Sequence, residues 1–516
     1  MKSKVIFYVA FTMLVPLVAA AQIQVGPGLQ YPDIGAAANA RAVHPGDTIF
    51  VHAGTYTDSS TLIDSLIGTP ERWITIMPFA QDSVSIHVQY TFQIAQYLRI
   101  SGLHFYGNDT AERARVFHLL FFDYQYACFT SNHDIIIENC TFAELNNTGK
   151  GNTGACLKID GTENFQIVNC VFRDGTNITD GISLNADRAG IVRNCLFQNM
   201  PGDGSHCKGG AKDITYEQNQ FINCSADGVD VGGDTGPQFF CPLGAPWEAD
   251  SIKVYANVFV GGLTGIRLSS CHHALIYNNT CFKCTEFAFR SLNTSETGIT
   301  LDSNYIYNNI FTTYSPNHIY LNASSNFNYN TEYFRNNLFH DYLNPDPTAI
   351  NWSEMPGVNV SGSLIGDPDF MDTTNADFSL KSGSPAIGAA WTTTEPTADY
   401  NNRPYSLTAR SIGALEFEEG SVRSADMAGA SAALFLAPNP CGNVLTIFFK
   451  STAELSNIRV MDALGRDALG VAIPPNPGAE SITLDASSLV NGEYLLLALG
   501  SNGAVLGHSI FVKLGK

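Results

Sequence analysis

The sequence is poor in positive charge. Its 516 residues include 28 lysines and arginines against 48 aspartates and glutamates, which gives a formal net charge of −20 at pH 7. Proteins that bind nucleic acids or anionic membranes gather positive charge on the binding surface, because much of their affinity comes from phosphate contacts. We therefore expect no nucleic-acid partner. A polyanionic ligand would need a local group of cations or a bound metal ion.

The sequence also lacks, after its N-terminal region, any apolar run long enough to cross a membrane. The N-terminal region itself has Lys2 and Lys4, an apolar run from Val5 to Val18 and then three alanines. A positive start, an apolar stretch and small residues are typical of a secretory signal peptide. We predict a signal peptide at residues 1–21, a mature chain that begins at Gln22, and an exported protein without a membrane span.

Amphipathic helices of ten or more residues are missing across Ile135–Phe339, which excludes leucine-rich, ankyrin and tetratricopeptide repeats. A short phrase returns there eight times instead, as in IIIENCTF and GIVRNCLF. Each phrase closes on a phenylalanine: Phe142, Phe172, Phe197, Phe221, Phe259, Phe282, Phe311 and Phe339. The alternation of β-branched and aromatic residues favours strands. We therefore predict an all-β fold, a right-handed parallel β-helix in which each repeat makes one turn.

Each phrase also predicts which side chains fill the coil. The phenylalanine and the residue two positions before it share one face of a strand, and we assign that face to the interior. The earlier position is held by Cys140, Cys170, Cys195, Asn219, Asn257, Thr280, Asn309 and Asn337. Most residues one position earlier are asparagines too. Amides on successive turns can bond to one another and to bends in the backbone, so we expect these asparagines to be structural.

Twelve cysteines in an exported protein would ordinarily indicate disulfides. Cys140, Cys170 and Cys195, however, fall at the interior position of consecutive repeats, where they would act as small apolar fillers. We expect mostly buried thiols, with two candidate bridges, Cys281–Cys284 and Cys207–Cys241.

The two ends of the solenoid resemble known secreted proteins. Residues Ile34 to Val43 have the pattern of a short amphipathic helix, and a helix over the open end of a coil would protect its first strands from edge pairing. The order of this helix, PGDTIFV and GTY resembles the opening of pectin-lyase-like β-helix proteins. The stretch from Gly366 to Glu416 resembles the closing segment of bacterial secreted β-helix proteins, and its loops and short strands suit the covering of the last turn. We place the capped β-helix at 22–345 and the closing segment at 346–417.

The rest of the chain changes character. Residues 418–433 are small, polar and without pattern, which indicates a linker. Residues 434–516 alternate strands with Gly and Asn turns and predict a small β-sandwich. The motifs Pro438-Asn439-Pro440, Asp462-x-x-Gly465 and Leu489–Tyr494 resemble the type IX secretion sorting domain of Bacteroidota. That resemblance implies the type IX machinery as a partner, export through periplasm and outer membrane, and a final location at the cell surface or in the medium.

A second set of strands precedes the phrases and predicts a groove. If the apolar residues of segments such as ACLKIDG and DGVDVGG point inward, the residues between them form one outward column, with neighbours one turn apart. The column contains Lys158, Ser183, His206 with Lys208, Asp230, Arg267 and Arg290. An ordinary solvated face is the alternative interpretation of such charges.

This column suits β-elimination of a uronic-acid polysaccharide, which requires neutralisation of the carboxylate and removal of the C5 proton. We predict Lys208 and His206 as the base, Arg267 as the carboxylate clamp and Asp230 as a further catalytic residue. Lys158 and Arg290 are predicted to bind substrate. The region around Lys208 loosely resembles polysaccharide lyase family six, whose members use a lysine base and an arginine on the following turn. Here Arg267 comes one turn later.

Four aspartates predict a Ca²⁺ site, because calcium takes oxygen ligands. They are Asp203, Asp227, Asp230 and Asp234, and turn aspartates without a metal are the alternative. A glycoside hydrolase would instead need two facing carboxylates about 5–10 Å apart, for which Asp203 and Asp230 are the pair. His272-His273 has no third ligand at metal spacing, so zinc is not predicted.

The insertion Asp234–Asp250 adds aromatic residues next to the groove. Phe239 and Trp247 could stack on sugar rings, or the loop could pack against the sheet edge. We predict an exported monomer that acts on extracellular polysaccharide, as a lyase for acidic glycans. The alternative is a glycan-binding or adhesive surface protein without catalysis.

Overall fold

The computed structural model describes residues 20–513 apart from a set of short gaps. The gaps are 58–60, 81, 108–117, 124–128, 147–153, 288, 293–298, 315–320, 324–328, 344–349, 351, 418–433, 438–440, 450–454, 463–465, 473–480 and 501–504. Residues 1–19 of the predicted signal peptide, the predicted linker and the Pro438-Asn439-Pro440 motif thus lie outside the described residues. Among those described, no helix is long and apolar enough to cross a membrane.

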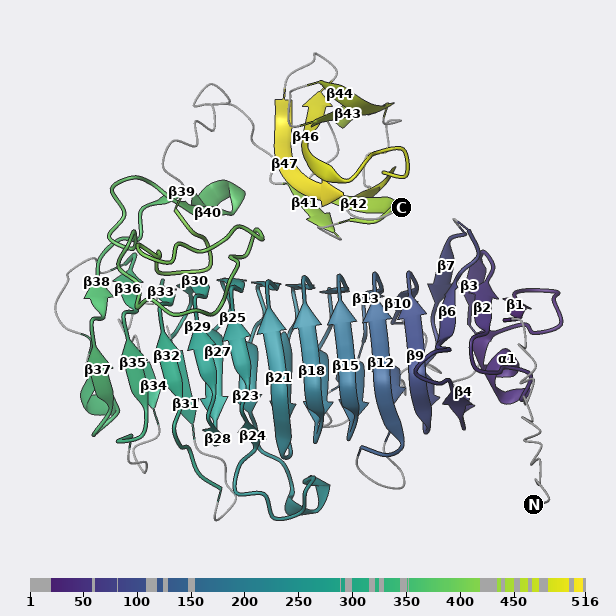
Figure 1. The fold of residues 1–516 in the computed structure, drawn as a ribbon, viewed down its shortest axis with the longest axis horizontal. Helices are drawn as coiled ribbons and strands as arrows, with labels where there is room; N and C mark the ends of the chain where they lie inside the picture. Colours follow the sequence, from purple (N-terminus) through teal and green to yellow (C-terminus); the bar gives the residue numbers. More distant parts are fainter. Residues whose placement is uncertain are drawn as a thin grey trace, which may run out of the picture.

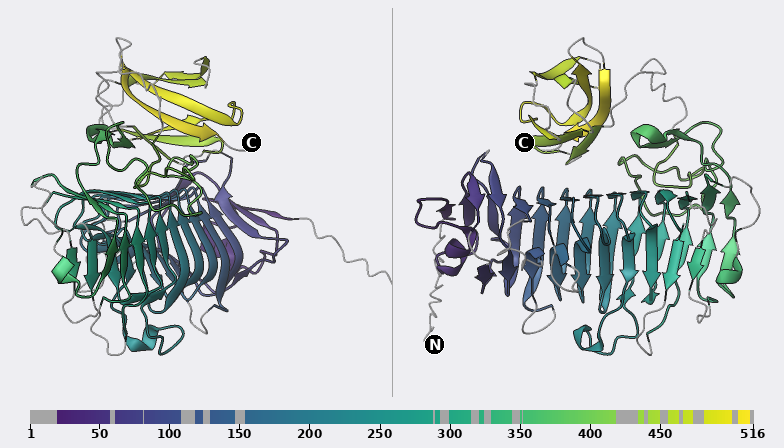
Figure 2. Two further views of the ribbon diagram at one scale, coloured as in Figure 1. Left: turned by 60° about the vertical axis from the view of Figure 1, so that its left-hand side comes forward. Right: turned by 180° about the vertical axis from the view of Figure 1, so that it is seen from behind.

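Three long parallel sheets run side by side and form an elongated coil (Figure 1, Figure 2). The first sheet contains β1 (Gln22–Val25), β2 (Thr48–Val51), β5 (Leu66–Ile67), β6 (Ile74–Pro78), β9 (Ala95–Ser101), β12 (Asn132–Glu138), β15 (Glu163–Val168), β18 (Arg188–Arg193), β21 (Ala211–Glu217), β24 (Ala249–Asp250), β25 (Lys253–Tyr255), β28 (Cys271–His272), β29 (Leu275–Tyr277), β32 (Tyr305–Tyr307), β35 (Tyr333–Arg335) and β37 (Asn359–Ser361). The second sheet contains β3 (Gly54–Tyr56), β7 (Val84–Ile86), β10 (His104–Tyr106), β13 (Thr141–Ala143), β16 (Val171–Arg173), β19 (Leu196–Gln198), β22 (Gln220–Ile222), β26 (Val258–Val260), β30 (Thr280–Cys284), β33 (Ile310–Thr313), β36 (Leu338–Asp341) and β38 (Leu364–Ile365). The third sheet contains β4 (Thr61–Ile63), β8 (Tyr90–Phe92), β11 (His118–Phe122), β14 (Gly154–Asp160), β17 (Thr179–Asn185), β20 (Ser205–Lys208), β23 (Asp227–Gly232), β27 (Thr264–Ser269), β31 (Phe289–Leu292) and β34 (Leu321–Ala323). Successive turns of the chain therefore add one strand to each sheet, and the predicted parallel β-helix is confirmed.

Stacked phenylalanines fill one side of the coil. Phe105, Phe142, Phe172, Phe197, Phe221 and Phe259 form one pile whose neighbouring ring centroids lie 4.5–4.9 Å apart with nearly parallel planes. All six are buried. Because each ring is fixed by the turns on both sides, the repeat of this residue fixes the register of the second sheet.

Buried asparagines form a second ladder along the axis. In the last five turns Asn219, Asn257, Asn279, Asn309 and Asn337 are fully buried. In each adjacent pair, the side-chain oxygen of the later asparagine accepts both the backbone N–H and the side-chain amide of the earlier one, at 2.8–3.1 Å. The residue before each of these, and before the cysteines of earlier turns, adopts a left-handed backbone with φ of 49–57°. Asparagine tolerates that conformation well, which explains its frequency at the bend.

The predicted interior position is wrong in one turn. Phe259 pairs with Cys281, and Phe282 pairs with Val260, so Phe282 points out of the coil. Asn279 rather than Thr280 therefore continues the asparagine ladder. The physical reason lies outside the coil, where Phe282 packs against Phe370 and Phe378 of the closing segment.

The cysteines are mainly buried thiols, as predicted, but both proposed bridges are wrong. Cys207, Cys281 and Cys284 are free and buried. Cys241 is disulfide-bonded, and therefore not to Cys207. Cys281 instead occupies the interior place that a phenylalanine holds in neighbouring turns.

Short elements cover the ends and one side of the solenoid. Helix α1 (Ile34–Asn39) begins at Asp33, whose carboxylate accepts the N–H of Ala36 at 2.7 Å, and it buries Ile34, Ala37 and Ala38 against the first turn. At the other end, η2 (Trp352–Glu354) packs Trp352 on Phe334 and Phe339. The closing segment contains β39 (Phe370–Asp372), η3 (Thr373–Asn375) and β40 (Asp377–Leu380).

The closing segment lies along the outer side of the second sheet rather than only over the last turn. Its core contacts include Val258, Ile310 and Leu338 of three different turns. Asn278 donates to the carbonyls of Ser411 and Gly413, at 3.3 and 3.1 Å. The prediction that this stretch covers the last turn was thus too narrow.

The C-terminal strands form two antiparallel sheets, as predicted. One contains β41 (Leu434–Ala437), β42 (Val444–Phe449) and β45 (Ser481–Asp485), and the other contains β44 (Asp467–Ala472), β43 (Leu455–Asp462), β46 (Gly492–Gly500) and β47 (Val505–Lys513). Leu445, Ile447, Ile458, Leu496 and Phe511 form part of a core of their own between the sheets.

Candidate functional site

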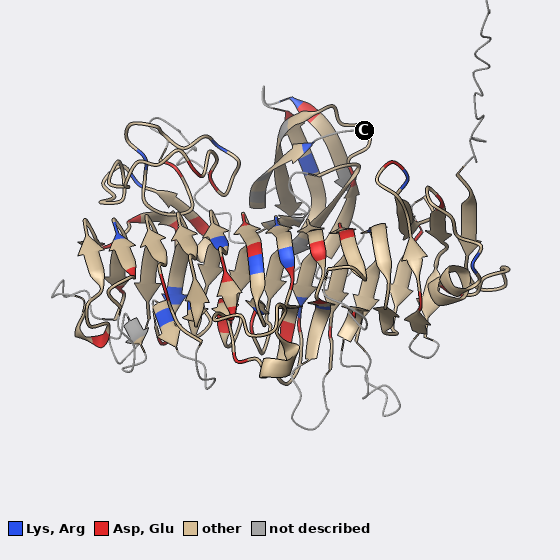
Figure 3. Ribbon diagram, turned by 60° about the horizontal axis from the view of Figure 1, so that its bottom comes forward, with Lys and Arg blue, Asp and Glu red and all other residues tan. Residues whose placement is uncertain are grey.

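The outer face of the third sheet brings the predicted column together. Lys158 pairs with Ser183, Ser183 with His206, His206 with Asp230, Asp230 with Arg267 and Arg267 with Arg290, one per turn. The intervening apolar residues, among them Leu184 and Val229, are buried inside the coil. The register inferred from alternation is therefore present in the structure. Figure 3 shows basic and acidic residues mixed along these turns rather than a basic stripe.

A recurring Asp-Gly pair adds a second column. Asp180-Gly181, Asp203-Gly204 and Asp227-Gly228 stand at the same place in three consecutive turns. A Cβ atom at Gly204 would lie 2.5 Å from the carbonyl oxygen of Gly228 and 2.5 Å from the Phe221 ring. The glycine is required by packing against the phenylalanine pile, and the aspartate before it is held on the outer side of the strand.

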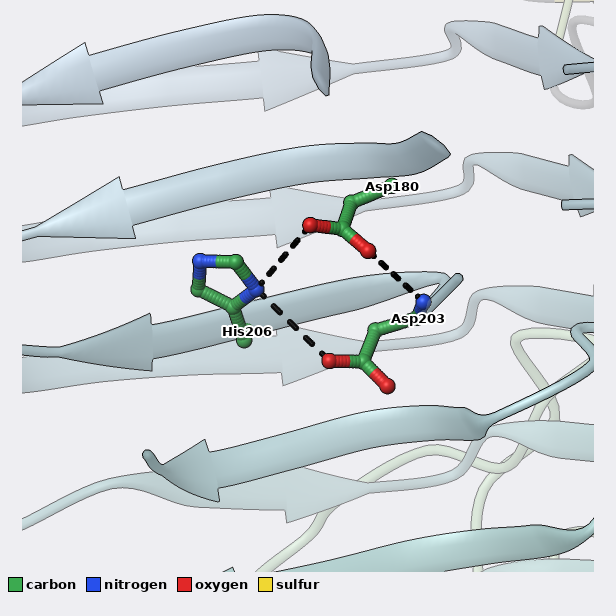
Figure 4. A group of neighbouring side chains, drawn as sticks. All are labelled: Asp180, Asp203 and His206. Carbon is green, nitrogen blue, oxygen red and sulfur yellow. Dashed lines mark hydrogen bonds and ion pairs between the residues drawn. The ribbon is translucent and has the colours of Figure 1, made fainter. Parts of the chain in front are cut away.

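Asp180, Asp203 and His206 form a compact buried group (Figure 4). His206 Nδ1 lies 3.5 Å from Asp180 Oδ2 and 3.6 Å from Asp203 Oδ2. The other ring nitrogen, Nε2, is 2.9 Å from Ser183 Oγ. The backbone N–H of Asp203 donates to Asp180 Oδ1 at 2.8 Å, which fixes the first carboxylate relative to the second.

Arginines neutralise the next two carboxylates. Arg267 Nη1 lies 2.8 Å from Asp227 Oδ2 without the alignment of a hydrogen bond, and Arg267 Nη2 donates to Asp230. Asp230 also accepts from Ser269 Oγ at 2.9 Å, and Arg290 Nη1 lies 3.4 Å from Asp227 Oδ1. The predicted role of Arg267 as a free carboxylate clamp is therefore not supported, because its guanidinium is already held by two buried aspartates.

Burial and mutual repulsion perturb the titration of this face. Burial raises the pKa of Asp203 to about 6, and the charge of Asp230 adds to the effect, while Arg267 and Lys208 oppose it. Burial and the Asp203 charge raise the pKa of Asp180 well above its usual value. Burial, with the Lys208 charge in the same direction, lowers the pKa of His206 well below its usual value, so its imidazole is neutral near pH 7. Such perturbed groups in one cluster mark candidate sites.

Lys208 is the cation next to this group. It has no ion pair within 4 Å among the described residues, and its side chain lies against Gly233, where a Cβ would come 2.7 Å from Lys208 Cδ. The adjacent glycines, Gly209 and Gly210, leave no open space beside it. A Cβ at Gly210 would lie 2.6 Å from the carbonyl oxygen of Cys241, so the insertion covers them.

The insertion is pinned beside Lys208 by a buried glutamate. Glu248 accepts the N–H of Gly209 at 2.9 Å with one oxygen and the N–H of Thr235 at 2.8 Å with the other. Burial raises the pKa of Glu248, and these bonds oppose the shift. Phe239, in η1 (Pro237–Phe239), remains 51% exposed on this loop. Its side chain is therefore largely open to solvent.

The other residues predicted for the site are engaged in other contacts or lie outside the buried group. Trp247 packs on His272 and under Lys212 at the edge of the first sheet, so the packing interpretation holds for it. Lys158 forms an ion pair of 3.2 Å with Asp160. Asp234 is exposed and stands outside the buried group. The four predicted calcium ligands thus do not form one site.

Residues that sequence reasoning missed include Asp180, Ser183 as a partner of His206, and Glu248. The Asp-Gly pair repeated at intervals of 23 and 24 residues was the available signal for Asp180. Ser183 was already in the predicted column, but its bond to His206 depends on side-chain rotamers. Glu248 carried no signal, since its role depends on the path of the insertion.

The donor set of the buried group fits a divalent cation. One ligand atom each from Asp180, Asp203 and His206 lies within 4.8 Å of the others, and no arginine among the described residues pairs with the two carboxylates. Carboxylate oxygens suit calcium, magnesium and manganese, whereas a neutral imidazole favours a transition metal. The group differs from the predicted one by gaining Asp180 and His206 and losing Asp227, Asp230 and Asp234.

Comparison with known proteins supports the architecture. Residues 90–241 match the family model described as the right handed beta helix region, and residues 436–513 match that of the secretion system C-terminal sorting domain. No curated protein matches the chain. The sorting domain marks the protein for export to the cell surface or the medium.

Solved structures with a similar course of the chain include several enzymes. A pectate lyase, Pel9A, is 14% identical and has a TM-score of 0.45, with 78% of this chain and 97% of that one covered. A family six alginate lyase, AlyGC, is 13% identical with a TM-score of 0.40, over 70% of this chain and 56% of that one. A lacto-N-biosidase from Eubacterium ramulus is 10% identical with a TM-score of 0.32, over 67% of each chain. Similarity at this level does not carry an activity to this chain.

Proposed function

We propose that this exported β-helix protein is a lyase that cleaves an acidic extracellular polysaccharide by β-elimination on the outer face of its third sheet. The observation that carries the proposal is the position of Lys208, half-buried and without an ion pair among the described residues, beside two buried carboxylates that no described arginine neutralises. Together they supply a basic group and a cation site on one rigid face.

The chemistry assigns one role to each part. Lys208 Nζ, in its neutral form, takes the proton from C5 of a uronate unit. The electron pair of the C5–H bond forms the C4–C5 double bond as the C4–O bond breaks. The leaving sugar oxygen keeps the electron pair of the C4–O bond and receives a proton from water. A divalent cation held by Asp180, Asp203 and His206 would withdraw charge from the uronate carboxylate. Phe239 offers a face for stacking on a neighbouring sugar.

Hydrolysis fits the geometry less well. It requires two carboxylates that are free to act on opposite sides of the bond. Asp230, one member of the predicted pair, is held by Arg267 and Ser269, so both of its oxygens are engaged. Glycan binding without cleavage is the second candidate function, and the exposure of Phe239 beside the column favours it.

The test measures absorbance from newly formed unsaturated uronates. The mature chain is incubated with polygalacturonate, alginate and glycosaminoglycans, with Ca²⁺, with Mn²⁺ or with a chelator. We expect a signal that falls at least about a hundredfold in Lys208→Ala, the usual contribution of a general base. Asp203→Asn is expected to abolish the dependence on the cation.

Lys253→Ala is the matched control, because Lys253 is an exposed lysine on the first sheet. It should retain full activity. Absence of any signal across the panel, or an unchanged rate in Lys208→Ala, would contradict the lyase proposal. Retention of the silent protein on an insoluble glycan, lost in Phe239→Ala, would establish the binding function in its place.

A further inference from the structure

Tyrosines gather on the outer face of the first sheet, away from the third sheet. In one column Tyr255, Tyr277 and Tyr307 stack with ring centroids 5.0 and 4.9 Å apart. Tyr277 and Tyr307 are buried, and Trp391 of the closing segment packs on Tyr307. In the neighbouring column Tyr305 and Tyr333 stack at 4.6 Å with planes 6° apart. These two remain 38% and 36% exposed. The second column is thus an uncovered aromatic surface.

The exposed stack stops where the chain provides a short polar residue. The register pairs Tyr333 with Asn359 and Arg335 with Ser361 on the last strand of the sheet. Neither side chain can continue the pile of rings. The result is a pocket of about 220 Å³ lined by Tyr305, Tyr333, Arg335, Asn359, Ser361 and Trp391. Pockets for drug-sized ligands measure roughly 300–1,000 Å³, so this one fits a single ring.

The wall of the pocket is rigid and carries a free positive charge. Trp391 is held by the side chain of Asn308, which accepts the backbone N–H of Trp391 at 2.7 Å and donates to its backbone carbonyl at 2.8 Å. The Arg335 guanidinium lies over the Trp391 ring, 4.1 Å from its centroid. Arg335 is exposed, and no carboxylate of the described residues lies within ion-pair distance of it. Its charge is therefore held in place but not neutralised.

We propose that this pocket binds one acidic sugar unit of a polysaccharide, as a second site separate from the Lys208 face. The Tyr305 and Tyr333 rings receive the sugar ring, since aromatic rings offer apolar surface with little conformational entropy to lose. Arg335 pairs with the uronate carboxylate, in a protein whose net charge of −20 otherwise repels such a ligand. Asn359 Oδ1 and Ser361 Oγ supply hydrogen bonds to hydroxyls, whereas the Asn359 amide already donates to the carbonyls of Asn330 and Glu332. The inference rests on the proposed function only for the class of polysaccharide.

Calorimetric titration with oligogalacturonate, and with the same oligomer methyl-esterified, tests this site. The full mature chain carries Lys208→Ala so that cleavage cannot occur. We expect Arg335→Ala to weaken binding of the acidic oligomer about tenfold and to leave the esterified one unchanged. Tyr333→Ala should weaken both, by about fivefold. Arg193→Ala is the matched control, because Arg193 lies on the same face but is paired with Glu217 at 3.2 Å.

The outcomes distinguish failure of this site from failure of the lyase proposal for the Lys208 face. Equal affinity for the two oligomers, or wild-type affinity in both Arg335→Ala and Tyr333→Ala, overturns the inference. Binding that depends on Arg335 in a protein that cleaves none of the polysaccharides supports the site while the lyase proposal fails. Cleavage by the wild-type chain without Arg335-dependent binding supports the lyase proposal and overturns the second site.

Discussion

At the scale of single residues, burial decides which charged groups are free to act. Arg267 has the expected position in the column, but two buried aspartates hold its guanidinium. Removing one partner of a buried ion pair is costly, because the other charge stays desolvated. Arg267 is therefore a structural residue: burial raises the pKa of Asp227 to about 7, and the charge of Arg267 opposes that shift. Lys208, half-buried and unpaired among the described residues, is the group that remains available.

A buried glutamate outside the proposed catalytic face gives a pH prediction. Burial raises the pKa of Glu332 to about 8, although Asn304 donates to it at 3.2 Å. In the unfolded chain it ionises near pH 4.5, so between about pH 5 and 8 the folded state binds the extra proton and stability falls as pH rises. Each pH unit in that window changes the free energy of unfolding by about 1.4 kcal/mol. Glu332→Gln should remove this slope.

Denaturant unfolding at pH 5 and pH 8 measures the pH-dependence of stability that Glu332 contributes. From pH 5 to pH 8, we expect the free energy of unfolding of Glu332→Gln to rise by about 3 kcal/mol relative to that of the wild type. At pH 5 the two proteins should differ little. Glu286→Gln, at an exposed glutamate, is the control and should show no such gain. Parallel pH profiles for wild type and Glu332→Gln would refute the assignment.

At the scale of strands and turns, the repeated phrase predicts the architecture because the same physical demand recurs in each turn. A ring must stack on the ring of the turn before it, and an amide must satisfy the buried backbone at the bend. One turn breaks the pattern: Phe282 points outward to meet Phe370 and Phe378, and Asn279 takes the interior place. That shift depends on a segment almost a hundred residues away, so local alternation could not predict it.

The candidate site shows the same limit. Alternation predicts the outward column from Lys158 to Arg290, because it follows from the strand period. It cannot predict which carboxylate an arginine holds, nor that the insertion covers Gly210, because both depend on side-chain rotamers and loop path. Asp180 was within reach, since the Asp-Gly pair recurs in three turns.

The asparagine ladder yields a prediction about Asn279. Its oxygen accepts the backbone N–H and the side-chain amide of Asn257 at 3.1 and 3.0 Å, and its amide donates to Val254 and Asn309. Asn279→Ala leaves several buried groups without partners, at about 1–3 kcal/mol each. We expect a loss of at least about 3 kcal/mol in the free energy of unfolding of the solenoid. Gln166→Ala, at an outward position of the first sheet, should cost about 0.5 kcal/mol or less. A similar loss in both variants would show that the ladder contributes little.

At the scale of the whole molecule, the chain combines a solenoid with a separate export module. The solenoid and its closing segment have their own buried clusters, and the C-terminal sandwich has another. Between the described residues of the two parts there is no hydrogen bond or ion pair. On a parallel coil the two proposed glycan sites would stand on different faces of one molecule, the Lys208 site on the third sheet and the Arg335 site on the first.

Removal of residues 418–516 tests this division. Because the two parts have separate cores, we expect the shortened chain to unfold with the same free energy as the solenoid of the full chain, within about 0.5 kcal/mol. Lyase activity and oligomer binding should be retained, since Lys208 and Arg335 both belong to the solenoid. In cells the shortened chain should accumulate in the periplasm, as the sorting domain is lost. Fractionation and immunoblotting measure the location, and denaturant unfolding measures the stability. A shortened chain that loses stability would show that the sandwich supports the solenoid, and one that still reaches the cell surface would show that the export signal lies elsewhere.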